Sequence, residues 1–142
     1  MYKKILVALD NTRADESLVP HVARMAQICG AQILLVHVAD GWVARNYDRL
    51  QLQESEEMKA DRAYLEKTAG DLRTQGLNAT AQLALGNPPE EILRISETEK
   101  CDLIAMTTHG HRFLGDLLYG STISKVRHNA MVPLLIVRAQ KV

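Results

Sequence analysis

The sequence predicts a single α/β domain in which a five-stranded parallel sheet is covered by helices on both faces. Short apolar runs with β-branched residues recur along the chain, and segments with helical spacing separate them. This alternation favours right-handed crossovers and a doubly wound sandwich. The 142 residues contain no linker, repeat or low-complexity tract. We therefore expect residues 1–142 to form one domain with a substantial core.

Five runs are the expected strands, and four of them are almost continuously apolar. Runs this short, with apolar residues on both sides, are typical of parallel strands that are buried on both faces. The four apolar runs are residues 4–9, 33–38, 103–106 and 134–137. The fifth run, residues 79–85, is more polar, and we expect it to lie at an edge of the sheet.

The first two expected helices are each followed by a glycine. Apolar residues recur every three or four positions in residues 18–29 and 58–72. Gly30 and Gly76 follow these segments, where left-handed backbone commonly caps a helix. Pro20 falls within the first segment and is expected to distort that helix. The charged run from residue 54 to residue 67 indicates a solvated helix face.

Prolines bound the last two expected helices. Pro88 and Pro89 precede two glutamates and open the third helix, because proline and acidic residues suit a first turn. The fourth helix contains Ile123, Val126 and Ala130 at helical spacing, and Pro133 closes it.

The charge balance disfavours nucleic acid and membranes as partners. Seventeen basic and seventeen acidic side chains give a formal net charge of zero. No apolar run approaches the roughly 18 residues that a membrane span needs. Cys29 and Cys101 are too few and too distant for a disulfide framework or a metal finger. With no signal-peptide pattern, we expect a cytoplasmic protein with two buried free thiols.

The candidate site lies at the carboxyl edge of the expected sheet, where open parallel sheets bind ligands. Asp10 and Asn11 follow the first strand, residues 37–40 end the second, and residues 106–122 follow the fourth. In this last stretch, Gly110 allows close approach to a ligand. Gly120, Ser121 and Thr122 are expected to open a helix. Its unpaired N–H groups would form a phosphate site or, as an equal alternative, a plain helix cap.

The sequence resembles the universal stress proteins of the UspA type over its whole length. The matching segments are residues 3–10, 35–38, 86–88, 101–106 and 132–137. ATP-binding members of that family carry G-x2-G-x9-G-[ST]. Here Gly110, Gly120 and Ser121 match its second glycine, third glycine and hydroxyl. The first glycine is replaced by Thr107, which we expect to weaken nucleotide binding.

The resemblance implies strand order 3-2-1-4-5 and binding of ATP or AMP, with magnesium if ATP is bound. It places Asp10 near the ribose and phosphates, the Val38 backbone against adenine, and Met106 in the pocket lining. Ala8, Thr107 and Thr122 complete the expected nucleotide-binding set.

The resemblance also implies a homodimer through the last strand. The apolar segment 133–138 ends the chain at an expected sheet edge. Pairing with a second copy would cover that edge.

Several histidines are open to more than one interpretation. His109, His111 and Arg112 are possible phosphate neighbours, and their spacing does not predict a dedicated metal site. His37, inside an apolar strand, is expected to be a hydrogen-bonded core residue.

The leading function is therefore regulatory binding of an adenine nucleotide during stress, with no catalytic residue assigned and at most slow ATP hydrolysis. The alternative is a nucleotide-free homodimeric interaction protein of the same fold, which Thr107 favours. A hydrolytic enzyme would need a positioned base or metal ligands beyond Asp10.

Overall fold

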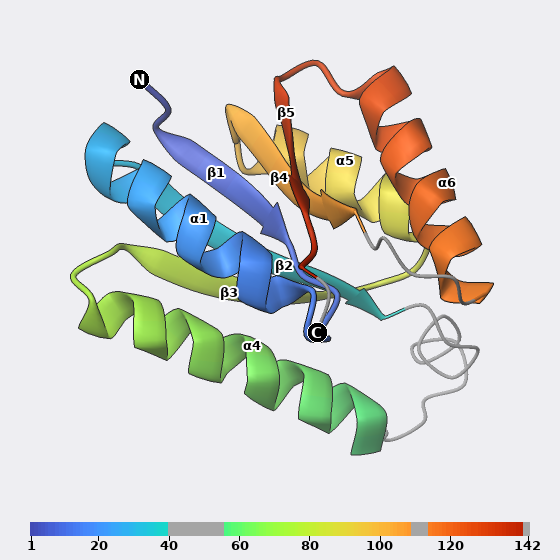
Figure 1. Cartoon of the computed structure of the whole chain (residues 1–142), viewed down its shortest axis with the longest axis horizontal. Helices are drawn as coiled ribbons and strands as arrows, with labels where there is room; N and C mark the ends of the chain where they lie inside the picture. Colours follow the sequence, from blue (N-terminus) through green and yellow to red (C-terminus); the bar gives the residue numbers. More distant parts are fainter. Residues whose placement is uncertain (40–55, 109–113, 141–142) are drawn as a thin grey trace.

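Strands and helices alternate along the chain, as the sequence predicted. The computed structural model describes residues 1–39, 56–108 and 114–140, and the backbone alone for residues 114–120. The elements in chain order are β1 (Lys4–Ala8), α1 (Asp15–Cys29), β2 (Gln32–Ala39), α4 (Glu56–Thr74), β3 (Ala79–Leu85), α5 (Pro88–Thr98), β4 (Leu103–Thr108), α6 (Leu114–Asn129) and β5 (Leu134–Arg138) (Figure 1).

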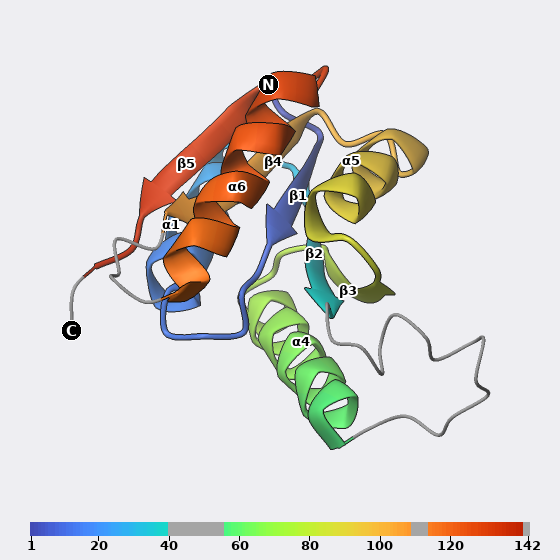
Figure 2. The ribbon, with the colours of Figure 1, turned by 90° about the vertical axis from the view of Figure 1, so that its right-hand side faces the viewer.

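The five strands form one parallel sheet in the order β3-β2-β1-β4-β5. This confirms the predicted fold and strand order. It also confirms that β3 is an edge strand and places β5 at the opposite edge. The chain reverses its direction of progress across the sheet between β1 and β4, so the switch point lies between these two strands (Figure 2).

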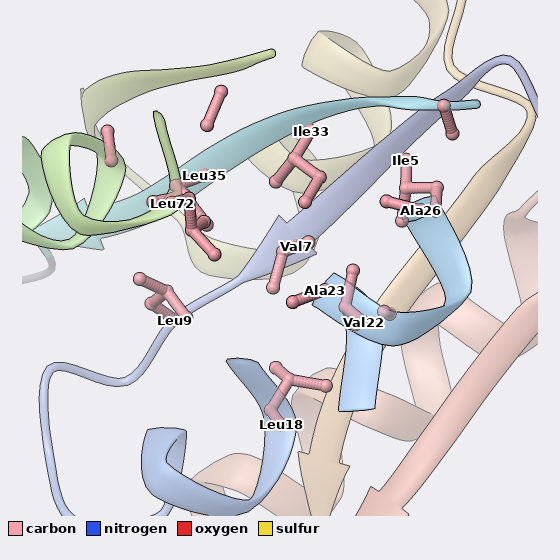
Figure 3. Packing of buried hydrophobic residues seen from close by; sticks show 14 of the residues in the cluster. Ile5, Val7, Leu9, Leu18, Val22, Ala23, Ala26, Ile33, Leu35 and Leu72 are labelled. Carbon is pink, nitrogen blue, oxygen red and sulfur yellow. The ribbon is translucent and has the colours of Figure 1, made fainter. Parts of the chain in front are cut away.

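Each face of the sheet has its own apolar core. On one face, Ile5, Val7 and Ile33 pack with residues of α1 and α4, including Val22 and Leu72 (Figure 3). On the other face, alternate residues of β1, β2 and β4 pack with residues of α5 and α6. Because both faces are covered, the strands are apolar on both sides, which is why they appear as continuous runs in the sequence.

The predicted glycine caps are confirmed. Gly30 and Gly76 have φ of 68° and 88°, in the left-handed region that glycine adopts at little cost. The N–H of Leu77 donates to the carbonyl of Leu72, which closes the end of α4. Helix α1 continues through Pro20, and the Asn87 side chain caps α5 by accepting the Glu90 N–H. None of the helices in the described part of the chain could cross a membrane.

Two sequence expectations are corrected by the structure. Helix α6 begins at Leu114, six residues before Gly120, so Gly120 lies inside the helix and does not open it. The leucines between 114 and 118 are strong helix formers and explain the earlier start. Both cysteines are free, but only Cys101 is buried. Cys29, at the end of α1, is half-buried.

Candidate functional site

The site predicted at the carboxyl edge is centred on the switch point between β1 and β4. Asp10 follows β1, and Thr107 lies near the end of β4. The Thr107 hydroxyl donates a hydrogen bond to Asp10 Oδ2 at 3.2 Å. A carboxylate is therefore held at the point where open α/β sheets bind their ligands.

Thr107 occupies an ordinary strand position. The residue is only 4% exposed, and its φ is not positive, so the threonine causes no backbone strain. Side chains alternate along a strand. Ala105 belongs to the core beneath α1 and α4, whereas Met106 belongs to the core beneath α5 and α6. Thr107 therefore shares the face of Ala105 and points away from the face that contains Met106.

Three of the predicted pocket residues share one apolar cluster. Ala8, Val38 and Met106 come from β1, β2 and β4, and all lie on the face that α5 and α6 cover. Each is buried, with 6–9% of its surface exposed. We call these three residues the apolar wall; they lie at the same carboxyl edge as Asp10 and Thr107, but on the opposite face of the sheet from the Thr107 side chain.

The turn after β1 is held by a buried carboxylate. Asp15, at the start of α1, is 1% exposed and accepts the backbone N–H groups of Asp10 and Asn11, each at 2.9 Å. It also accepts the Tyr64 hydroxyl at 3.0 Å. Burial is the main cause that raises the pKa of the Asp15 carboxyl to about 6, and the nearby Asp10 charge adds to this effect. Burial, followed by the Asp15 charge, raises the pKa of the Tyr64 hydroxyl.

A second polar contact joins the same turn to α4 and β2. Asn11 has a left-handed backbone with φ of 58°, and its Nδ2 donates to Asp61 Oδ1 at 2.9 Å. Asp61 Oδ2 lies 3.5 Å from His37 Nε2. The other ring nitrogen of His37 lies 2.8 Å from the Leu9 carbonyl oxygen. His37 is thus hydrogen-bonded as predicted, but it is only part-buried and it takes part in a polar cluster.

Sequence reasoning missed the contribution of Asp15, Asp61 and Tyr64. Asp15 had a local signal, because an acidic residue at a helix start next to a turn often accepts backbone N–H groups. Asp61 and Tyr64 lie in the charged run assigned to solvent, and about 50 residues separate them from the turn they contact. In α4, Arg62 is exposed, whereas the neighbouring Asp61 faces the turn.

The remaining predicted residues follow β4. Gly120, Ser121 and Thr122 all lie within α6, where backbone N–H groups bond to carbonyls of the preceding turn. The expected phosphate cradle at a helix start therefore does not form at Gly120. Ser121 is exposed and Thr122 is half-buried. Four predicted neighbours lie outside the described residues: His109, Gly110, His111 and Arg112.

Sequence comparisons identify relatives that match almost the whole chain. The model of the universal stress protein family matches residues 1–138. Universal stress protein MJ0577 of Methanocaldococcus jannaschii is 27% identical over 155 residues, covering 97% of this chain and 96% of that protein. A universal stress protein of Thermus aquaticus is 32% identical over 138 residues, covering 97% of this chain and 100% of its own length.

Solved structures show the same fold. The structure of MJ0577 gives a TM-score of 0.81 at 28% identity, covering 100% of this chain and 99% of that one. An Archaeoglobus fulgidus universal stress protein in complex with dAMP gives 0.70 at 20% identity, covering 96% of this chain and 98% of that one. A universal stress protein in complex with cAMP gives 0.71 at 16% identity, covering 98% of each chain. With the family model matched from residue 1 to residue 138, the chain belongs to the universal stress protein family.

Proposed function

We propose that this chain binds an adenine nucleotide, ATP or AMP, at the carboxyl edge of its sheet and acts as a regulatory stress-response protein in the cytoplasm. The observation that carries the proposal is the contact between Asp10 and Thr107 across the switch point. The carboxyl edge that holds this carboxylate acceptor also carries the apolar wall of Ala8, Val38 and Met106. An adenosine moiety requires this combination, because its base is flat and largely apolar and its ribose carries hydroxyl donors.

A buried acceptor in the same turn supports the proposal. Within the described part of the chain, Asn11 Oδ1 is buried without a hydrogen-bond partner. The amide orientation is fixed, because Nδ2 faces two acceptors of Asp61, its carboxylate and its carbonyl oxygen. Burying an acceptor without a donor costs about 1–3 kcal/mol. A ribose hydroxyl or an ordered water would relieve this cost.

Related proteins also support nucleotide binding. Two proteins of the same fold are described in complex with dAMP and with cAMP. Both ligands are adenine nucleotides with a single phosphate. The proposed contacts to phosphate are the Ser121 and Thr122 hydroxyls together with Gly110. His109, His111 and Arg112 are proposed neighbours of the phosphates, and magnesium would accompany ATP.

The proposed function includes a homodimer formed through β5. This strand pairs with β4 on one side only and lies at an edge of the sheet. Ile136, in the middle of β5, is 36% exposed. Pairing β5 with its symmetry mate would satisfy the outward backbone groups and cover this side chain.

Mass spectrometry of the purified protein tests nucleotide binding directly. The protein should release a stoichiometric adenine nucleotide on denaturation, and Asp10→Ala should reduce the amount. Wild-type protein that carries none, and shows no thermal shift with ATP, ADP or AMP plus magnesium, would instead favour the nucleotide-free interaction protein. That alternative is supported by Thr107, which already donates to Asp10 without a ligand.

A further inference from the structure

We propose that His37, Asp61 and Asn11 form a proton-dependent latch that fastens the turn after β1 to α4, so that the protonation of His37 controls nucleotide affinity. The inference rests on the proposed function for its effect on the ligand. The latch itself is a property of the chain alone, and it joins three segments that lie far apart in the sequence: the turn after β1, β2 and α4.

The hydrogen-bond partners of His37 determine how many protons the latch holds. Nδ1 lies 2.8 Å from the Leu9 carbonyl oxygen, which can only accept, so Nδ1 carries a hydrogen. Nε2 lies 3.5 Å from Asp61 Oδ2, and an ionised carboxylate also only accepts. A neutral imidazole has a single N–H. Both contacts are therefore favourable together only when a second proton lies between Nε2 and Oδ2.

Partial burial strengthens this contact. The side chains of His37 and Asp61 are 15% and 17% exposed. Charges at such positions interact more strongly than charges in open solvent. Without the proton between Nε2 and Oδ2, the lone pair of Nε2 would face the Asp61 carboxylate and repel it. The carboxylate would then be repelled at the position where it accepts the Asn11 amide.

Asn11 transmits the state of the latch to the candidate site. It directly follows Asp10, and Asp15 holds the backbone N–H groups of both residues. Asn11 has a left-handed φ, which asparagine adopts more readily than most residues, and its amide bonds to Asp61 tie the turn to α4. Releasing Asp61 would remove one of the side-chain contacts that hold the turn, directly next to Asp10.

Among the described residues, other titratable groups lie near the latch. The turn contributes Asp10, α1 contributes Asp15, and α4 contributes Tyr64 beside Asp61. Strand β3, which flanks β2, carries no titratable side chain. Together with Asp61, these groups include three carboxyls, so the described surroundings of His37 are acidic. Asp15 titrates in the opposite functional sense, because its ionised form is the better acceptor for the turn.

The test compares nucleotide affinity across pH in matched variants. We would titrate wild-type protein, His37→Gln, Asp61→Asn and the control Asp71→Asn with AMP and with ATP plus magnesium, from pH 5.5 to 8.5. Glutamine can still donate toward Asp61 but does not titrate. Asp71 is an exposed acid on the same helix that pairs only with Lys67 in the described contacts. Ligand phosphates and Asp15 titrate in every variant, so their effects cancel in affinity ratios.

The wild-type affinity, divided by that of His37→Gln at the same pH, should fall about three- to tenfold as the pH rises. The affinity of Asp61→Asn should depend on pH in the same way as that of His37→Gln, and less strongly than that of the wild type. The affinity of Asp71→Asn should change with pH as that of the wild type does. Identical profiles for wild type, His37→Gln and Asp61→Asn would overturn the latch. Using two variants guards against one of them failing to fold.

A ligand-free measurement separates the latch from the proposed function. Hydrogen exchange at the Asp10 and Asn11 amides should lose protection with rising pH in the wild type but not in His37→Gln. If no nucleotide binds and this difference is seen, the proposed function fails and the latch stands. If nucleotide binds but protection and affinity ratios do not depend on pH, the latch fails and the function stands.

Discussion

Thr107 is the residue at which this chain departs from the nucleotide-binding motif, and its hydroxyl donates a hydrogen bond to Asp10. From the sequence alone, we expected threonine at this position to weaken nucleotide binding. The structure directs the side chain away from the Met106 face and onto Asp10. We therefore expect that the hydroxyl orients the carboxylate, and that glycine at this position would bind nucleotide less tightly than threonine.

Thr107→Val tests this role because valine keeps the branched shape and removes the donor. Loss of a hydrogen bond worth about 1 kcal/mol should weaken AMP and ATP binding about fivefold. Thr107→Ser keeps the hydroxyl and should stay within about twofold of the wild type. Calorimetric titration of both variants decides the matter, and equal affinity for Val and Ser would show that the hydroxyl does not matter.

Asp15 predicts a dependence of stability on pH. Its carboxyl has a raised pKa of about 6 in the folded protein, above that of an exposed aspartate. The folded state therefore binds more protons than the unfolded state between about pH 4 and pH 6. Because of Asp15, the free energy of unfolding should fall by about 2–3 kcal/mol as the pH rises through this window, and the cost stays constant above it.

Asp15→Asn removes this titration. Relative to the wild type, the variant should gain free energy of unfolding as the pH rises from 4.5 to 7, even if loss of an acceptor makes it less stable at every pH. Urea unfolding at four pH values in this range measures the difference. A wild-type-minus-variant difference that does not change with pH would contradict the buried carboxyl.

Among individual residues, those with local sequence signals were the ones that could be predicted. Asp10 directly follows an apolar strand, and the structure places it at the switch point. Asp61 and Tyr64 reach the site from α4, and no spacing rule connects them to a turn about 50 residues earlier. Their role follows from the tertiary structure alone.

At the level of elements, helix ends provide a matched pair of glycines. Gly30 has φ of 68° at the end of α1, whereas Gly70 lies inside α4 without a positive φ. Apart from the adjoining chain, a Cβ added at either position would have no neighbouring atom of the described residues within 4 Å. Gly30→Ala should lower the free energy of unfolding by about 1 kcal/mol, because left-handed backbone strains alanine.

Gly70→Ala should raise the same free energy by up to about 1 kcal/mol, because alanine is the better helix former. Denaturant unfolding of both variants at one pH gives the sign of the change in the free energy of unfolding for each variant. Changes of the same sign in both variants would mean that backbone conformation does not control these positions.

Strand β5 is the element that the proposed dimer uses, and its register selects the residue to change. The N–H of Ala139 donates to Thr108, and Ile104 donates to the Pro133 carbonyl. Backbone groups alternate in direction along a parallel strand, so the N–H of Val137 faces β4 and that of Ile136 faces outward. A proline at position 136 therefore removes an outward donor, whereas one at position 137 breaks the sheet.

Ile136→Pro should convert a dimer to a folded monomer in analytical ultracentrifugation at micromolar concentration, with circular dichroism close to that of the wild type. Val137→Pro serves as the comparison and should lower thermal stability more strongly. A wild-type protein that sediments as a monomer would refute the dimer.

Most elements could be predicted because each has a local cause: apolar runs for strands, glycine caps, and the proline pair that opens α5. The start of α6 could not be read correctly, because glycine, serine and threonine at 120–122 resemble a helix cap. The helix-forming leucines before them extend the helix to Leu114. Helix propensity over one and a half turns thus outweighed a cap-like tripeptide.

For the whole molecule, the doubly wound topology explains why the candidate site residues lie at one edge of the sheet. Parallel strands bring Asp10, Val38 and Thr107 to the same edge although they come from three different strands. The two cores on opposite faces hold these strand ends in place. The fold and edge were predictable from alternation of elements, whereas the polar cluster that supports the turn depended on how α4 packs.

The most direct test of the central claim is calorimetric titration of nucleotide-free protein with AMP, and with ATP plus magnesium. The account predicts saturable binding of one nucleotide per chain, weakened at least tenfold by Asp10→Ala in a protein that remains folded. The control is Asp102→Ala, because Asp102 accepts N–H groups at the opposite edge of the sheet. The folded fraction of this variant should bind nucleotide with the affinity of the wild type. Folded wild-type protein that takes up neither nucleotide, or binding that is unchanged in Asp10→Ala, would contradict the account.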